Sequence, residues 1–283
     1  MTAFVRSPLA RARDTFGRAR VITDSVSVAA GRALTRLGTS LLLVPHRGER
    51  VEVPSPITTD AAPIDIVDDL VAYTGLEREQ VLDLIQRRHE SFRVEWHAFP
   101  PALRNEGWFY LSSRTYLFAN ATHDGETIAD SLDKLLPARC DILEFGGGTG
   151  NLALALAARG HAVDFVERSA LQKDFVRFRV DRSGFDRVRI LDQWAPLERA
   201  RYDLVCAFDV FEHVETLAET LDNVLSSIRP SGLLAESSPF VRNVSNPMHH
   251  ETEAEFVGIM KTHGFVRTRD DEHFRLWTRP ISQ

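Results

Sequence analysis

Two patterns of hydrophobic and polar positions follow one another along the chain, and the change falls near residue 125. Before it, the stretches 64–74 and 76–90 carry apolar residues at helical spacing, after prolines at positions 54, 56 and 63. We expect two short helices there. After it, short apolar runs alternate with helical stretches, which is typical of a parallel sheet covered by helices on both faces.

The second pattern is regular enough to assign each element. Strands are expected at 140–145, 162–167, 188–191, 204–208 and 233–237, with 265–270 and 274–278 as a closing pair. Helices are expected at 127–136, 151–159, 169–182, 216–228 and 253–263. The predicted fold class is α/β, a Rossmann-like, doubly wound, seven-stranded sheet preceded by a helical region that covers the substrate. The expected domains are an arm at 1–55, a helical lid at 56–124 and a sheet domain at 125–283.

Charge is unevenly distributed. The whole chain has a formal net charge of -6 and an isoelectric point near 5.9, which argues against a general polyanion binder. The first fifty residues are locally basic, with nine arginines against three acidic residues. This arm can be read as a surface helix or disordered segment, as an organellar targeting segment, or as an electrostatic docking arm.

The positions of the cysteines and the hydropathy of the chain indicate where in the cell the protein is expected. Cys140 and Cys206 both fall in apolar runs, so they read as core residues and not as a disulfide or a metal pair. A reducing, cytoplasmic location is expected. No apolar stretch approaches the roughly 20 residues that cross a bilayer, so no membrane association is expected.

A glycine-rich turn follows the first strand of the sheet domain. The segment 141–150 reads Asp-Ile-Leu-Glu-Phe-Gly-Gly-Gly-Thr-Gly, an apolar strand that leads into a turn and then a helix. Glycines at 146, 148 and 150 allow a tight bend and let a ligand approach the main chain. With a strand before it and a helix after it, the turn predicts a nucleotide site.

Two acidic residues define the kind of nucleotide. Glu167 ends the next strand, where a carboxylate can accept hydrogen bonds from both hydroxyls of a ribose. Glu144 precedes the glycines, and the chain carries no second device for holding a phosphate. These features favour a ribose-bearing cofactor with a positively charged end over a dinucleotide.

From Glu144 to Gly150 the sequence resembles the first motif of class I S-adenosylmethionine-dependent methyltransferases, acidic-x-Gly-x-Gly-x-Gly. The resemblance extends over 125–283 and includes Glu167, Asp192 and the segments 202–214 and 228–233. It implies methyltransferase activity with S-adenosylmethionine as cofactor. It also implies roles for single positions: the glycines face the methionine and ribose, Glu167 binds the ribose, and Asp192 contacts adenine. The expected cofactor-binding set is Glu144, Gly146, Gly148, Gly150, Glu167, Asp192 and Asp209.

Aromatic residues are dense between positions 92 and 116. They can fill a small core or line a pocket for an apolar or ring-bearing acceptor. Because this segment is separate from the cofactor motifs, we expect it to supply specificity. The candidate substrate residues are Trp96, Trp108, Tyr110 and Tyr116.

Histidines follow two strands whose ends should face the same cleft. His213 lies past the fourth strand, and His249 and His250 follow the fifth. His213 and His250 are the candidate catalytic residues, because an imidazole can remove a proton near neutral pH. With Glu212, two of these histidines make a plausible divalent-metal set: Glu212, His213 and His249.

The Glu-His pair has two family counterparts. It resembles the Glu-x-x-Glu-His plus distant His arrangement of metal-dependent small-RNA methyltransferases, although Asp209 stands at the first glutamate. It is also similar to the Glu-His of ubiquinone-pathway O-methyltransferases. The other reading is that Glu212 and His213 begin a helix and that the later histidines lie in a solvated loop.

These observations predict methyl transfer to a hydroxyl, amine or carbon of a small molecule. A natural-product intermediate and a role in antibiotic biosynthesis are expected. One alternative is a metal-assisted RNA 2′-O-methyltransferase, which the acidic charge disfavours. Another is a cofactor-binding protein that has lost activity, because fold alone does not establish function. A homodimer is compatible with the sequence.

Overall fold

The described part of the chain begins at Asp65, so the basic arm lies outside it. The computed structural model describes residues 65–100, 109–111, 113–137, 139–192, 195–243, 246–270 and 272–280. All of them belong to one compact unit, 47–283. The expected domain boundaries at 55/56 and 124/125 stay predictions.

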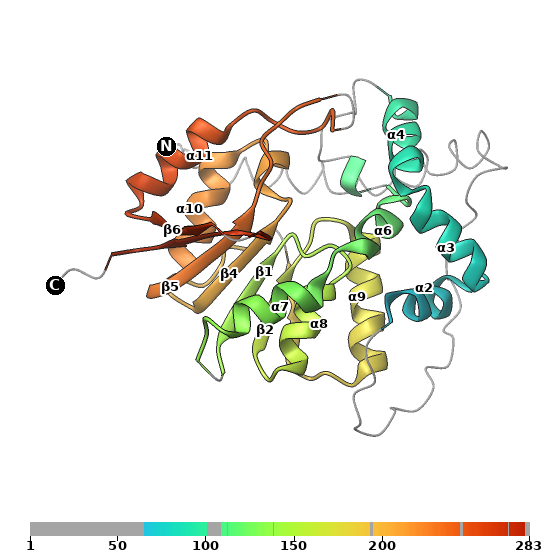
Figure 1. The fold of residues 1–283 in the computed structure, drawn as a ribbon, viewed down its shortest axis with the longest axis horizontal. Helices are drawn as coiled ribbons and strands as arrows, with labels where there is room; N and C mark the ends of the chain where they lie inside the picture. The colour runs from blue at the N-terminus through green and yellow to red at the C-terminus, as the bar shows by residue number, and fades with distance from the viewer. Residues whose placement is uncertain are drawn as a thin grey trace, which may run out of the picture. The chain divides into compact units, whose positions relative to one another are not determined.

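A seven-stranded sheet forms the centre of this unit (Figure 1), with strand order β3-β2-β1-β4-β5-β7-β6. The strands are β1 Asp141–Phe145, β2 Ala162–Val166, β3 Val188–Ile190, β4 Tyr202–Phe208, β5 Ile228–Ser237, β6 Val266–Asp270 and β7 Arg275–Thr278. The first five strands are parallel, and β7 pairs antiparallel with both β5 and β6. The predicted doubly wound, Rossmann-like, seven-stranded fold is confirmed.

One strand is longer than the hydrophobic pattern indicated. β5 was expected from 233, but it begins at Ile228, where Ile228 pairs with Tyr202 of β4. The register between the two strands then shifts before Leu204 pairs with Leu233. The Arg-Pro-Ser-Gly segment in between is therefore an irregularity inside the strand. Its polar, turn-like sequence is the reason that the hydrophobic pattern did not predict a strand there.

Helices cover both faces of the sheet, as Figure 1 shows. One face packs against α10 Leu217–Ser227 and α11 Glu253–Thr262, in a core that includes Leu143 and Val205. The other packs against α7 Gly125–Asp133, α8 Asn151–Ala158 and α9 Ala170–Ser183, in a core that includes Ile142 and Leu204. Neighbouring residues of one strand thus enter opposite cores, which is why these strands are apolar throughout.

Short helices precede the sheet domain: α2 Ile66–Thr74, α3 Arg78–Gln86, α4 Arg88–Ala98, α6 Tyr116–Ala119 and the 3-10 turn η2 Asn120–Thr122. The single helix expected at 76–90 is wrong. A capping box between Glu77 and Gln80 starts α3 at Arg78, and the chain leaves helical geometry at Arg87 before α4 begins. Among the described helices, none is both long and apolar enough to span a bilayer.

The strand order reverses between β1 and β4, since their outer neighbours, β2 and β5, lie on opposite sides. In open α/β sheets, ligands bind beyond the carboxyl ends of the strands at this point. The residues that follow β1 and β4 are the glycine turn and Asp209.

Candidate active site

The glycine turn bends as the sequence predicted. Gly146, Gly148 and Gly150 have φ values of 75°, 57° and 73°, in the left-handed region that favours glycine. Gly150 also stands at the N-cap of α8, so the turn passes directly into the helix. The turn therefore lies at the N-terminus of a helix.

Glu144 lies beneath the turn and is buried. A Cβ atom on Gly147 would come within 2.5 Å of the Glu144 carboxyl carbon, so only glycine fits there. Burial raises the pKa of Glu144 to about 8, and the Ala153 amide opposes this rise. Its Oε2 atom has no hydrogen-bond partner in the described part of the chain. One oxygen of this buried carboxyl is therefore left without a hydrogen bond from the described residues, while Arg179 is the nearby positive charge that lowers its pKa.

Glu167 connects the end of β2 to the same turn. Its Oε2 accepts a hydrogen bond from the Gly148 amide at 2.9 Å, and its Oε1 accepts one from the Ser169 amide at 2.8 Å. Burial raises the pKa of Glu167, while these backbone donors lower it. Each oxygen keeps a second lone pair, so binding of a ribose by Glu167 stays a prediction.

The turn forms one wall of a cleft whose lining includes Glu144, Gly146, Gly147, Gly148 and Asp209. Sequence analysis missed several polar residues that complete it: Asn120, His123, Thr149 and Asn151. His123 Nε2 lies 3.6 Å from Asp209 Oδ2. Asp209 itself has φ 53°, an unusual conformation for a residue with a side chain, of the kind that clusters at functional sites.

The predicted adenine contact lies apart from this lining. Asp192 is exposed just past β3, on the same edge of the sheet, and it is not among the residues that line the cleft. The role of Asp192 stays a prediction.

The aromatic segment forms a small core, with two of its rings near the cleft. Trp96 is buried and packs edge-on against Phe109, 4.9 Å between centroids, so it supports this core. Tyr116 lines the cleft and lies 4.9 Å, centroid to centroid, from Tyr110. Trp108 lies outside the described residues. The substrate roles of all four stay predictions, with Tyr110 and Tyr116 the two that the structure brings towards the site.

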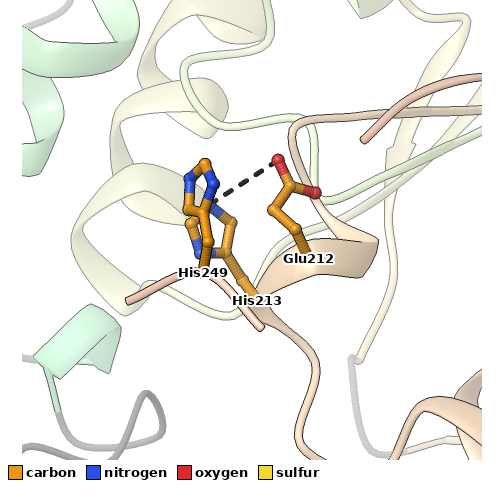
Figure 2. A group of neighbouring side chains, drawn as sticks. All are labelled: Glu212, His213 and His249. Atoms are coloured by element: carbon orange, nitrogen blue, oxygen red, sulfur yellow. Dashed lines mark ion pairs between the residues drawn. The ribbon is translucent and has the colours of Figure 1, made fainter. Parts of the chain in front are cut away.

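Figure 2 shows Glu212, His213 and His249 beside one another. One ligand atom from each lies within 4.8 Å of the others, and His213 Nε2 lies 4.0 Å from Glu212 Oε1. The turn η3 Phe211–His213 carries the first two. The His250 amide donates a hydrogen bond to the Glu212 carbonyl at 2.7 Å, which holds the later segment against η3.

Burial controls the charge of this cluster. It raises the pKa of Glu212 to about 8 and lowers the pKa of His213 to about 3. It also lowers the pKa of His249. The catalytic roles of His213 and His250 stay predictions.

The strand order, the glycine turn and the two buried carboxylates define a nucleotide-cofactor enzyme of the Rossmann-like class. Residues 119–278 match the methyltransferase domain family, which is more than half of the chain, so the protein belongs to that family. The chain thus contains a domain of the S-adenosylmethionine-dependent methyltransferase type.

Individual relatives are distant. A 106-residue segment is 33% identical to tenellin synthetase of Beauveria bassiana, covering 34% of this chain and 2% of that protein. The [4+2]-cyclase SpnF is 16% identical with a TM-score of 0.44, over 51% of this chain and 58% of that one. A TehB-like SAM-dependent methyltransferase from Corynebacterium glutamicum is 17% identical with a TM-score of 0.44, over 57% and 92%. This chain therefore spans a small part of tenellin synthetase and little more than half of SpnF.

The site fits the cofactor. S-adenosylmethionine carries an ammonium group and a sulfonium, and Glu144 offers a buried carboxylate oxygen that no described residue satisfies. A cation there would offset the cost of burying that charge. The left-handed glycines let the turn pack closely against neighbouring side chains, and Gly146 and Gly148 line the cleft.

Proposed function

We propose that the methyl acceptor is a small molecule, a natural-product intermediate, that enters between the cofactor cleft and the aromatic residues of the N-terminal segment. The observation that carries this proposal is the continuous path of Tyr116, Tyr110 and His213. Tyr116 lines the cleft, its ring contacts Tyr110, and the Tyr110 hydroxyl lies 3.0 Å from His213 Nδ1. Flat aromatic rings beside a cofactor suit an apolar or ring-bearing acceptor.

Charge supports a small acceptor over a nucleic acid. The chain has a net charge of -6, whereas phosphate binding needs a surplus of lysine and arginine. The match to tenellin synthetase supports the same acceptor class, because that protein is named for the synthesis of a compound. A cytoplasmic location is part of the proposal, and the two free, buried cysteines, Cys140 and Cys206, support it.

The proposal assigns a role to each of these groups. When bound, the cofactor supplies a methyl carbon, to which the acceptor's lone pair bonds while the carbon–sulfur electron pair stays on sulfur. Glu144 and the glycine turn hold the cofactor, and Tyr110 and Tyr116 orient the acceptor, which is the principal contribution to such a displacement. For a hydroxyl acceptor, His250 removes the proton.

The test is methyl transfer from S-adenosylmethionine with a labelled methyl group. Small hydroxylated and aminated aromatic compounds are offered in parallel with total RNA, at two salt concentrations. We expect label in the small-molecule fraction. Label in RNA that disappears at higher salt would instead support the 2′-O-methyltransferase alternative. Cofactor binding without transfer to any acceptor would indicate a protein that has lost activity.

A further inference from the structure

Glu212 is a buried carboxylate that the fold leaves unsatisfied. Its side chain is fully buried, and no well-formed hydrogen bond reaches either of its oxygens in the described part of the chain, although the nearby Ser238 hydroxyl lowers its pKa. Buried charges in proteins are normally paired, hydrogen-bonded or bound to a metal ion. Its nearest polar neighbours include His213, whose Nε2 lies 4.0 Å from Oε1 (Figure 2).

Both histidines of the cluster are oriented by a hydrogen bond at Nδ1. His249 Nδ1 lies 2.9 Å from the Pro239 carbonyl, which can only accept, so Nδ1 carries the proton and Nε2 the lone pair. His213 Nδ1 lies 3.0 Å from the Tyr110 hydroxyl, and its Nε2 faces Glu212. Metal-ligating histidines are held in this way, with one ring nitrogen bonded to a supporting group.

We propose that Glu212, His213 and His249 bind one divalent transition-metal ion of the zinc, manganese or iron(II) class. Two imidazoles with one carboxylate favour these ions over magnesium and calcium, which prefer oxygen ligands throughout. One ligand atom from each residue already lies within 4.8 Å of the others. Ligands about 2.0–2.2 Å from a zinc ion lie roughly 3–3.5 Å apart, so side-chain shifts of about 1 Å close the site.

Two segments far apart in the sequence are held together to make this set. The His250 amide bonds to the Glu212 carbonyl at 2.7 Å, which anchors the chain next to His249. Met248 is buried in the aromatic cluster with Tyr110, which fixes the other side of the same segment. The three ligands are therefore preorganised by packing that is independent of the ion.

The site also narrows the acceptor class, an extension that rests on the proposed function. Three protein ligands leave at least one coordination position open. Tyr110 bonds to Nδ1 of His213 and packs against Tyr116 of the cleft, so the proposed ligand His213 is one ring away from the proposed acceptor path. A divalent ion there selects acceptors with an oxygen donor and lowers the pKa of a hydroxyl.

The test uses tag-free full-length protein dialysed against a chelator. Zinc is titrated by calorimetry, cobalt by its visible absorption, and magnesium serves as the contrasting ion. We expect one equivalent of zinc, a cobalt spectrum, and much weaker magnesium binding. Glu212→Gln and His249→Asn should each weaken zinc binding by about tenfold or more. His263→Asn is the matched control, because His263 lies at the end of α11, 3.7 Å from Asp222 and outside the cluster.

Thermal unfolding guards against a variant that folds poorly. Zinc should raise the melting temperature of the wild type in a concentration-dependent way and raise that of folded Glu212→Gln less at each concentration. An equal rise in both proteins, or zinc binding no tighter than magnesium binding, overturns the metal site. S-adenosylmethionine binding and methyl transfer are measured on the same samples. Transfer without specific metal binding refutes only this inference, whereas specific metal binding without transfer refutes only the proposed function.

Discussion

A buried ion pair ties the N-terminal helices to the glycine turn, and its removal is the sharpest test of the structure. The Arg179 side chain is 2% exposed and its partner Asp69 is 8% exposed. Arg179 donates hydrogen bonds to Asp69 at 2.8 Å, to the Thr149 carbonyl at 2.6 Å and to Asn151 at 2.7 Å. Burial lowers the pKa of Arg179, and the charge of Asp69 opposes that shift.

Asp69→Ala leaves this guanidinium buried with only neutral acceptors. Breaking a buried pair from one side costs about 3–5 kcal/mol of unfolding free energy. At roughly 2–4 °C per kcal/mol, the melting temperature should fall by about 6–20 °C. Asp69→Asn keeps an acceptor but loses the charge, so its loss should be smaller. Because Arg179 also holds Thr149 next to the turn, cofactor affinity should fall as well.

The matched control is Asp83→Ala. Asp83 pairs with Arg87 at 2.9 Å, but both side chains are about half exposed or more, at 49% and 61%. Exposed pairs contribute about 0–1 kcal/mol. Urea unfolding, followed by circular dichroism, compares the variants. A loss below about 1 kcal/mol for Asp69→Ala would refute the assignment of a buried, stabilising pair.

Four further variants and one control test the site and the aromatic residues beside it. Gly148→Val should weaken S-adenosylmethionine binding by about 100-fold in calorimetry, because the residue needs φ 57° and an added Cβ would lie 2.7 Å from the nearest side chain. Gly160→Ala is its control, since φ is 92° but nothing lies within 4 Å, and it should leave that affinity unchanged. Glu144→Gln should weaken cofactor binding yet stabilise the free protein at pH 8, because the raised pKa of Glu144 makes its ionisation unfavourable to folding. Tyr116→Ala should raise the acceptor KM at nearly constant cofactor Kd, whereas Trp96→Ala should lower the melting temperature through loss of its buried contacts.

The sign of the Glu144 effect can be followed across pH. A carboxyl whose folded pKa lies near 8, above its ordinary value near 4.5, stabilises the fold fully below 4.5 and loses that contribution as pH rises through 8. The melting temperature of the wild type should therefore fall relative to that of Glu144→Gln between pH 5 and pH 8. A difference in melting temperature that does not depend on pH would contradict the assignment of Glu144. An equal rise in the acceptor KM and the cofactor Kd of Tyr116→Ala would contradict the assignment of Tyr116.

The sheet was predictable because its signals are local. Each strand is a short apolar run bounded by polar or turn residues, because both sheet faces are covered by helices. Such runs can be recognised in the sequence without knowing which strands pair. The wrong predictions concern the bounds of elements that depend on contacts with neighbouring segments. β5 extends back to Ile228 because Tyr202 pairs with it, and the helix expected at 76–90 breaks at Arg87, where no proline or glycine marks the end.

The sequence by itself determined the glycine turn, the two carboxylates and the family resemblance, because these depend on residue types at fixed spacing along one chain segment. Only the tertiary structure decided which distant residues complete the site. Asn120 and His123 reach the cleft from the segment before the sheet, Arg179 reaches back to Asp69, and the segment at His249 meets Glu212 through packing. No local pattern encodes such contacts, because they depend on how separate elements bury their apolar faces against one another.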